Sequence, residues 1–222
     1  MLTAGFFCFT RPIQAATDAA CTRLTEQPRI NFYSSYGKLA YDFKQDQAAV
    51  TRIARRFGII ERGLFASGLA VVNVKWEISV NTLSNIMNND DFCVAPSNID
   101  IFIGYSDPVI YIADNLKSGS CEYNVVLRHE QTHQQINKTA LDYFLPRFKK
   151  QIREIIAQTP PLQVTHIDEI DNATAKLTAD YNRQIAPLIE DFKRHLLQEQ
   201  SKLDNHTNYE FESRLCRPEN SD

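Results

Sequence analysis

Residues 123–133 read YNVVLRHEQTH, and they carry the most informative pattern of the chain. Val125 and Val126 precede His129 by four and three positions, which predicts a helix with one buried stripe. On that helix His129 and His133 lie four residues apart and therefore on one face. Two imidazoles placed in this way can converge on one zinc ion, which accepts nitrogen ligands in tetrahedral geometry.

Glu130 follows the first histidine and completes the pattern H-E-x-x-H, the zinc-helix signature of metallopeptidases. In that chemistry the bound metal brings the pKa of a water molecule to about neutral. Glu130 is then placed to accept the water's proton and to deliver it to a leaving amine. Histidine and glutamate are also ordinary helix residues, so the pentad alone equally fits a solvated helix.

The flanking residues favour a helix that is supported on both sides of the pentad. Residues 118–120 read SGS and offer N-cap chemistry, and Glu122 suits the first turn of a helix. Apolar residues continue the helical spacing to Phe144, and Pro146 would kink the helix or end it.

The rest of the chain predicts an α+β fold. Alternating apolar residues indicate strands at 36–43, 72–80, 99–103 and 109–112, and residues 46–57 have helical spacing. We expect a small antiparallel sheet packed on the helix of the pentad. The strand at 109–112 is either an edge against which a peptide substrate lies or plain sheet core.

A long antiparallel helical hairpin is expected to follow. A break at residues 159–161 precedes a second helix from about residue 168 to beyond residue 200. Two long helices joined by a short loop pack antiparallel. If the turn centres near Leu162, residues 191–196 lie beside residues 129–133.

The pattern leaves the third metal ligand open. His195 ranks first, because it lies in the segment expected opposite the pentad, although it is equally a packing histidine. Glu154 suits the common spacing of a glutamate some twenty-odd residues further on, but it requires a break near Pro146. The other candidates are Glu199, Asp204, His206 and Glu210.

The composition of the chain limits the classes of partner that it can bind. The chain has 222 residues, 43% of them hydrophobic, and a net charge of -3, which suits one domain with a sizeable core. It has no basic stripe for nucleic acid and no apolar run that would span a membrane. We therefore expect neither a nucleic-acid partner nor a transmembrane span, but a peptide or protein substrate.

The N-terminus predicts export. An apolar stretch at residues 4–9 precedes the small residues of a cleavage site, so residues 1–16 suit a signal peptide or its remnant. The positively charged start is missing, and an ordinary frayed terminus is the alternative. The mature part, residues 17–222, is then a single zincin-like domain that ends in the helical hairpin. Its location is periplasmic or extracellular.

Cysteine usage supports the same location. Removal of residues 1–16 takes Cys8 away and leaves four cysteines, an even number that favours two disulfides. The alternative is four reduced thiols in a cytosolic protein. Of the three possible pairings we favour Cys93–Cys121 together with Cys21–Cys216.

Residues 30–216 resemble a family of bacterial secreted zinc-dependent proteases in the order of their elements: a strand around Trp76, Cys93 with the strand at 99–103, HEQTH, and a long helical pair. The C-terminal pattern of that family is Tyr-Asp-x-x-Thr-x-His-Gly, where residues 203–210 read LDNHTNYE. The family's histidine and glycine are Tyr209 and Glu210 here.

The resemblance implies a zincin-like metallopeptidase and leaves its metal site incomplete. If the family's histidine serves the metal, this chain uses His206, Glu210 or Tyr209 in its place. Asp204 and Thr207 match the pattern, and together with Tyr209 they can equally serve to orient a ligand.

The sequence thus predicts a secreted metallopeptidase that hydrolyses peptide bonds with zinc-activated water and Glu130 as general base. The main alternative is an envelope protein that keeps the zincin scaffold and binds zinc or a partner without turnover. Hydrolysis of an amide or ester of the cell wall is a third possibility.

Overall fold

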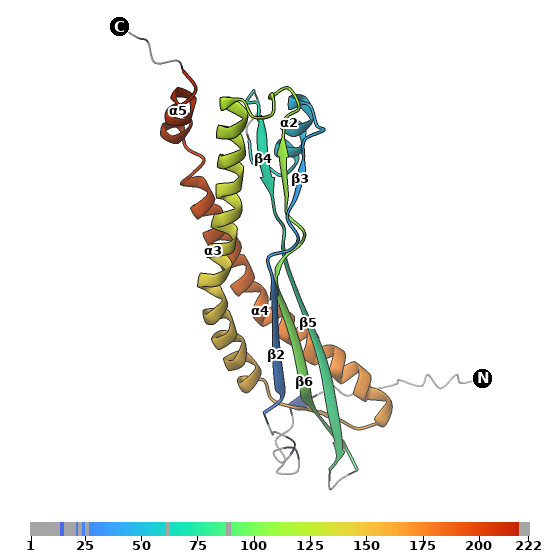
Figure 1. Ribbon diagram of the computed structural model, residues 1–222. Helices are drawn as coiled ribbons and strands as arrows, with labels where there is room; N and C mark the ends of the chain where they lie inside the picture. The colour runs from blue at the N-terminus through green and yellow to red at the C-terminus, as the bar shows by residue number, and fades with distance from the viewer. Residues whose placement is uncertain are drawn as a thin grey trace, which may run out of the picture. The chain divides into compact units, whose positions relative to one another are not determined.

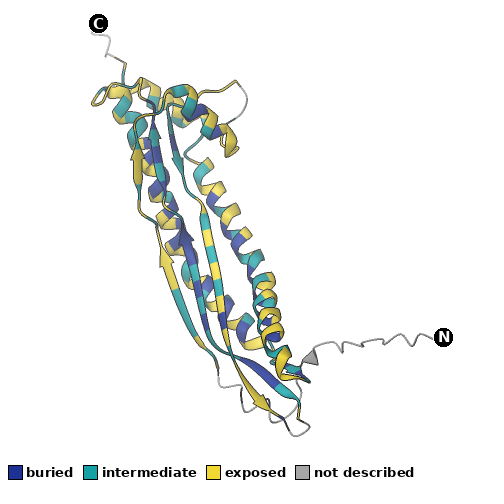
Figure 2. Ribbon diagram, turned by 90° about the vertical axis from the view of Figure 1, so that its right-hand side faces the viewer, coloured by how far each residue is buried: buried dark blue, intermediate teal, exposed yellow. Residues whose placement is uncertain are grey.

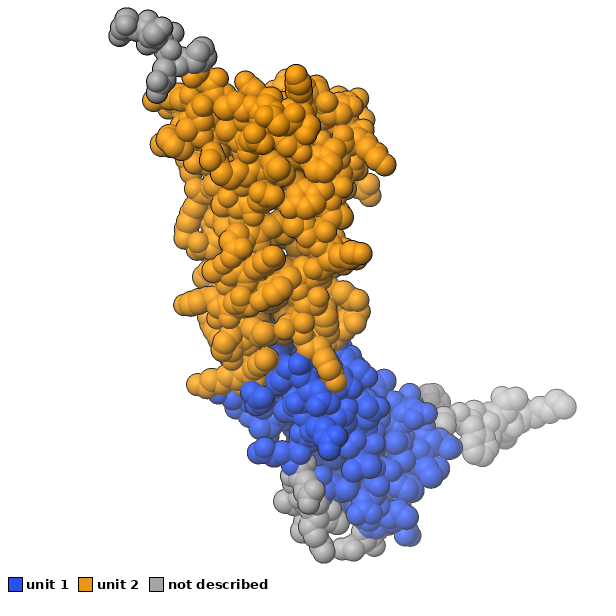
Figure 3. Space-filling view, in the orientation of Figure 1, with its two compact units in different colours: residues 1–32, 78–101, 151–185 blue, residues 33–77, 102–150, 186–222 orange. Residues whose placement is uncertain are grey.

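The computed structural model describes residues 14–15, 21, 24, 27–60, 63–87 and 90–217. These residues confirm the predicted α+β class (Figure 1). The chain divides into two compact units (Figure 3): unit 1 comprises residues 1–32, 78–101 and 151–185, and unit 2 comprises residues 33–77, 102–150 and 186–222. The single domain expected over 17–222 stays a prediction. Most of the expected export signal, residues 1–16, lies outside the described residues.

The larger sheet has the strand order β1-β8-β6-β2, with β5 also paired to β6. Its central strand β6 alternates as the sequence predicts, and Ile99, Ile101 and Ile103 are at most 1% exposed. The strands are β1 (Gln14–Ala15), β2 (Arg29–Ser35), β5 (Val74–Ile86), β6 (Phe92–Tyr105) and β8 (Leu162–Val164).

The smaller sheet belongs to unit 2 and has the order β3-β7-β4. Strand β7 (Val109–Ile112) pairs in parallel with β3 (Ala40–Asp42) and antiparallel with β4 (Gly68–Val71). The sheet is therefore mixed, not antiparallel as the sequence predicted. Residues 109–112 form its centre and not its edge, because both neighbouring strands are hydrogen-bonded to them.

Helix α2 (Gln47–Arg56) lies where the sequence predicts it. The Asp46 carboxylate caps it by accepting a hydrogen bond from the backbone N–H of Ala49 at 2.6 Å. Its buried residues Val50 and Ala54 form a core cluster with Leu69 of β4. The small sheet is held against this helix by apolar contact.

The long helices are α3 (Cys121–Gln158) and α4 (Ile170–Ser201). Helix α3 continues through Pro146, where the sequence predicted a kink or the end of the helix. Pro146 and Asp142, the residue whose carbonyl loses its helical partner, are both exposed, so water can take the place of the missing hydrogen bond. Buried and exposed stretches alternate along the helices (Figure 2). In α4 the buried positions recur every three or four residues, as expected: Ala173, Leu177, Tyr181, Ile185, Ile189, Phe192 and Leu196.

Within unit 2 the two helices pack antiparallel, and their register differs from the predicted one. The ring of Phe144 lies 5.5 Å from that of Phe192, and the side chains of His133 and Gln200 are hydrogen-bonded. These pairs place the midpoint of the connection near residue 167 and not at Leu162. Strand β8 and the 3-10 turn η1 (Ile167–Glu169) lengthen the connection, which therefore turns later than the sequence suggests.

All four expected cysteines form disulfides, but the predicted pairing is wrong. Cys21 is bonded to Cys93 in unit 1, and Cys121 to Cys216 in unit 2, with Cα atoms 5.5 Å apart in each pair. The antiparallel return of α4 explains the second bond, because it brings the end of the chain back to the first residue of α3.

Candidate metal centre

The pentad lies within α3, as predicted, on a face that is buried and polar. His129, Glu130 and His133 are 6%, 6% and 8% exposed. At the start of the helix, the hydroxyl oxygen of Ser120 accepts a hydrogen bond from the backbone N–H of Tyr123 at 3.2 Å. The two imidazoles are thus held on one side of a rigid helix and are withdrawn from bulk water.

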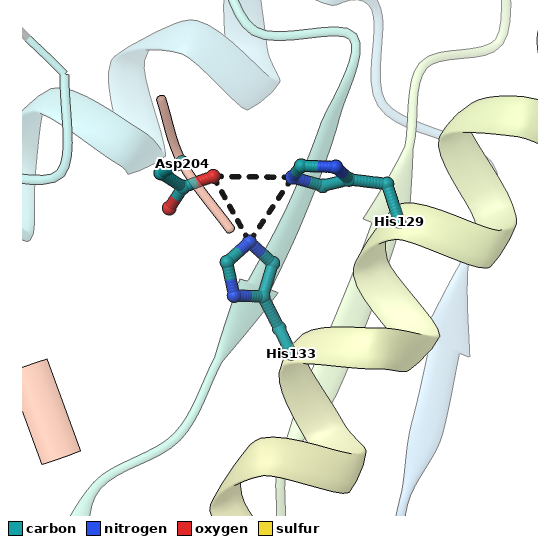
Figure 4. A group of neighbouring side chains, drawn as sticks. All are labelled: His129, His133 and Asp204. Atoms are coloured by element: carbon teal, nitrogen blue, oxygen red, sulfur yellow. Dashed lines mark hydrogen bonds and ion pairs between the residues drawn. The ribbon is translucent and has the colours of Figure 1, made fainter. Parts of the chain in front are cut away.

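Asp204 joins the two histidines from the segment that follows α4 (Figure 4). Its Oδ1 atom lies 3.1 Å from Nε2 of His129 and 3.1 Å from Nε2 of His133, and the two nitrogens are 3.1 Å apart. Ligand atoms about 2.0–2.1 Å from a tetrahedral ion are about 3.3 Å from one another. The spacing of the three atoms therefore suits the binding of one metal ion.

His195, which the sequence ranked first as third ligand, does not belong to this group. Its Nε2 lies 3.7 Å from Oδ1 of Asp191, and its ring packs 5.2 Å from that of Phe144. The later turn of the hairpin explains the error, because it moves Gln200 and Asp204 to the level that residues 191–196 were expected to occupy.

The other carboxylates and the remaining histidine that the sequence offered are exposed. Because α3 is unbroken, Glu154 lies further along the same helix than His133. The chain does not turn back between them, so Glu154 stays away from the histidine. Glu199 and Glu210 form ion pairs with Lys202 and Arg214, respectively. His206 and Thr207 are exposed in the first turn of helix α5 (His206–Arg214).

The outer nitrogens of both histidines have hydrogen-bond acceptors. Oε2 of Glu212, on α5, lies 3.0 Å from Nδ1 of His129. Oε1 of Gln200 is the partner of Nδ1 of His133, while Nε2 of Gln200 donates to the backbone oxygen of His133 at 3.2 Å and to Oδ1 of Asn137 at 2.6 Å. In the neutral tautomer that carries its proton on Nδ1, each Nε2 lone pair would be free to bind a cation at the point that the two rings share.

Tyr209 contacts two members of the group. Its hydroxyl donates a hydrogen bond to Oδ1 of Asp204 at 2.6 Å, and its ring stacks on that of His129 at 5.4 Å. Burial, and then the Asp204 carboxylate, raise the pKa of Tyr209, so the hydroxyl keeps its proton. The orienting role expected of Tyr209 stays a prediction, and these two contacts are the ones through which it would act.

Acidic neighbours favour the protonated imidazoles in the metal-free site. Burial acts to lower the pKa of His129 and His133, but Asp204 together with Glu130 and the other hydrogen-bonding neighbours outweighs it and raises the pKa of both rings above 6.5. Burial acts to raise the pKa of Asp204, but hydrogen bonds from both imidazoles and Tyr209 hold it well below 3.8. A divalent cation would replace the imidazolium protons and pair with the same carboxylate.

Glu130 lies beside strand β4 and stands outside the three-atom group. Burial raises the pKa of its carboxyl to about 7, and the imidazoles of His133 and His129 and a hydrogen bond from the backbone N–H of Ala70 partly oppose this. Gly68 provides the space, because a Cβ there would lie 2.6 Å from Oε1 of Glu130 and 2.5 Å from Cγ1 of Val126. The carboxyl is thus poised to exchange a proton near neutral pH.

Sequence reasoning missed Gln200 and Glu212. The correct register of the helical hairpin would have identified Gln200, because that register places Gln200 opposite His133. Glu212 has no local signal. The pairing of Cys121 with Cys216 would have located it, because Cys121 lies eight residues before His129 and Cys216 lies four after Glu212.

Comparison with known proteins finds no match to this chain among protein-family models, curated proteins or solved structures. The resemblance to secreted zinc-dependent proteases therefore stays a prediction. None of the helices in the described part of the chain has the length and apolarity that crossing a membrane requires.

Proposed function

We propose that this protein is an exported zinc-dependent hydrolase that cleaves peptide bonds. The observation that carries the proposal is the convergence of His129, His133 and Asp204 on one point, next to a buried carboxyl of Glu130 that is not part of the group. Two imidazoles and one carboxylate are a ligand set typical of catalytic zinc, and a separate glutamate is the usual proton carrier.

When bound, zinc supplies a water molecule of near-neutral pKa and polarises the carbonyl of the substrate. His129 and His133 would provide the nitrogen ligands, and Asp204 would provide the carboxylate oxygen. Glu130 accepts the proton of the attacking water on its carboxylate and then delivers it to the nitrogen of the leaving amine. Burial raises the pKa of this carboxyl to about 7 in the metal-free protein, which makes its carboxylate a stronger base than an ordinary glutamate.

The outer edge of β4 supports a peptide as substrate, because among the described strands β4 pairs only with β7. The backbone N–H of Ala113 donates to the carbonyl of Ser67 at 2.8 Å, so the next residues that bond to β7 are Leu69 and Val71. The backbone groups of Gly68 and Ala70 then point away from β7, toward the side where Ala70 meets Glu130. An extended peptide that adds to this edge would pass directly beside the general base.

The two disulfides support export, because such bonds persist in oxidising compartments.

The test is metal content and proteolysis by the full chain and by Glu130→Gln. We expect one zinc per chain in both proteins and cleavage of a random peptide library, detected by mass spectrometry, by the unaltered chain alone. Absence of zinc, or equal cleavage by Glu130→Gln, would refute the proposal. Zinc bound tightly without any cleavage would favour a binding protein on the same scaffold.

A further inference from the structure

Helix α5 supplies part of the metal centre although it is weakly anchored. It has nine residues, none of them buried. Helices of this length are marginal on their own in water, because few hydrogen bonds offset the entropy of the first turn. Specific attachments must therefore hold α5 in place.

The attachments of α5 lie at the metal centre and at a disulfide. Tyr209 is bonded to Asp204, and Glu212 lies 3.0 Å from Nδ1 of His129, with the Glu212 side chain 15% exposed. Just beyond the helix, Cys216 is bonded to Cys121, the first residue of α3. The disulfide thus joins α5 to the same helix that carries the histidines.

A carboxylate on the outer nitrogen of a metal-binding histidine acts on the metal in two ways. It fixes the tautomer and the ring orientation, and it makes the ligating nitrogen more basic. Removal of such a partner typically lowers metal affinity by 10- to 100-fold.

We propose that Glu212 is a positioning residue for the metal ligand His129, and that the Cys121–Cys216 disulfide holds Glu212 in this position. Zinc affinity then depends on a covalent bond outside the metal site. The inference rests on the zinc site proposed above.

The first test compares substitutions on α5 by competition with a chromophoric zinc chelator. Glu212→Ala should weaken zinc binding by about 10- to 100-fold. Glu212→Gln should stay within a few-fold of the unaltered protein, because its amide oxygen still accepts the Nδ1–H bond. Glu210→Ala is the matched control, since Glu210 lies on the same helix but pairs with Arg214, and it should leave affinity unchanged.

The outcomes of this test separate the two proposals. Failure of the unaltered protein to bind zinc would overturn the proposed function. Tight zinc binding by the unaltered protein and equally tight binding by Glu212→Ala would overturn only the role of Glu212. Equal losses in Glu212→Gln and Glu212→Ala would also contradict positioning through a hydrogen bond.

The second test removes each disulfide in turn. Cys121→Ser with Cys216→Ser should weaken zinc binding by about tenfold or more, whereas Cys21→Ser with Cys93→Ser, in unit 1, should not. In a Glu212→Ala background the loss from the first pair should be clearly smaller, because its main effect is already absent. Equal losses from both pairs, or a full additional loss in the Glu212→Ala background, would overturn the role of the disulfide.

Discussion

Nε2 of His129 and Oδ1 of Asp204 lie 3.1 Å apart, although 75 residues separate them in the chain. The distance depends on α4, which runs antiparallel to α3 and ends at the level of the pentad. Asp204 comes three residues after the end of that helix, where a backbone hydrogen bond from its N–H to the carbonyl of Gln200 continues the helical turn. The Asp204 carboxylate is therefore positioned by the end of a helix and not by a free loop.

Asp204→Ala should lower zinc affinity more than the 10- to 100-fold typical of an outer partner, because it removes a direct ligand. Chelator competition would measure the change. His195→Ala is the control, since that ring lies against Phe144 and outside the group. A larger loss in His195→Ala than in Asp204→Ala would reverse the assignment.

Glu130→Gln should abolish hydrolysis and stabilise the metal-free protein above pH 7. The folded protein raises the pKa of this carboxyl from 4.5 to about 7, so its ionisation opposes folding increasingly as the pH rises through this range. Removal of the charge should add on the order of 1 to 3 kcal/mol to the free energy of unfolding. Denaturant titration at about pH 8 would measure it, and lower stability of the variant would contradict the assigned environment.

Zinc should stabilise the protein more at high pH than at low pH. The raised pKa of His129 and His133 means that their protons stabilise the metal-free fold below about pH 6.5, and that this contribution is lost as the pH rises through the folded values. Zinc requires the unprotonated nitrogens. The zinc-induced rise in Tm should therefore grow between about pH 5.5 and pH 8. An equal or larger rise at the lower pH would be inconsistent with ligation by these imidazoles.

Gly68→Ala should impair hydrolysis while zinc remains bound. The new Cβ would lie 2.6 Å from Oε1 of Glu130 and 2.5 Å from Val126, so the general base or its helix must shift. Such overpacking typically costs about 1–3 kcal/mol of stability. Zinc content serves as the internal control, because Gly68 is not a ligand, and an unchanged rate of peptide cleavage would exclude the proposed contact.

Helices and strands with a regular spacing of apolar residues could be predicted from the sequence. His129 and His133 share a face because residues four apart on any α-helix do so, whatever surrounds them. The capping of α2 by Asp46 and the alternation of Ile99, Ile101 and Ile103 depend equally on near neighbours in the chain.

The parts of the metal centre that are distant in sequence depended on register. A few residues of β8 and η1 in the hairpin connection decided that Asp204 and Gln200, and not His195, lie beside the pentad. The pairing of β8 with β6 joins segments that are far apart in the chain, and no local sequence pattern predicts it.

A helix with two histidines on one face and a neighbouring glutamate could be predicted from helical period, and two disulfides could be predicted from the even number of cysteines. Packing alone brought the Asp204 carboxylate to the two histidines and set the partners of both Nδ1 atoms, the disulfide pairing and the pairing of β4 with β7 as its one neighbour among the described strands. Each of these is a contact between segments far apart in the chain, and such contacts are set by how helices and strands pack.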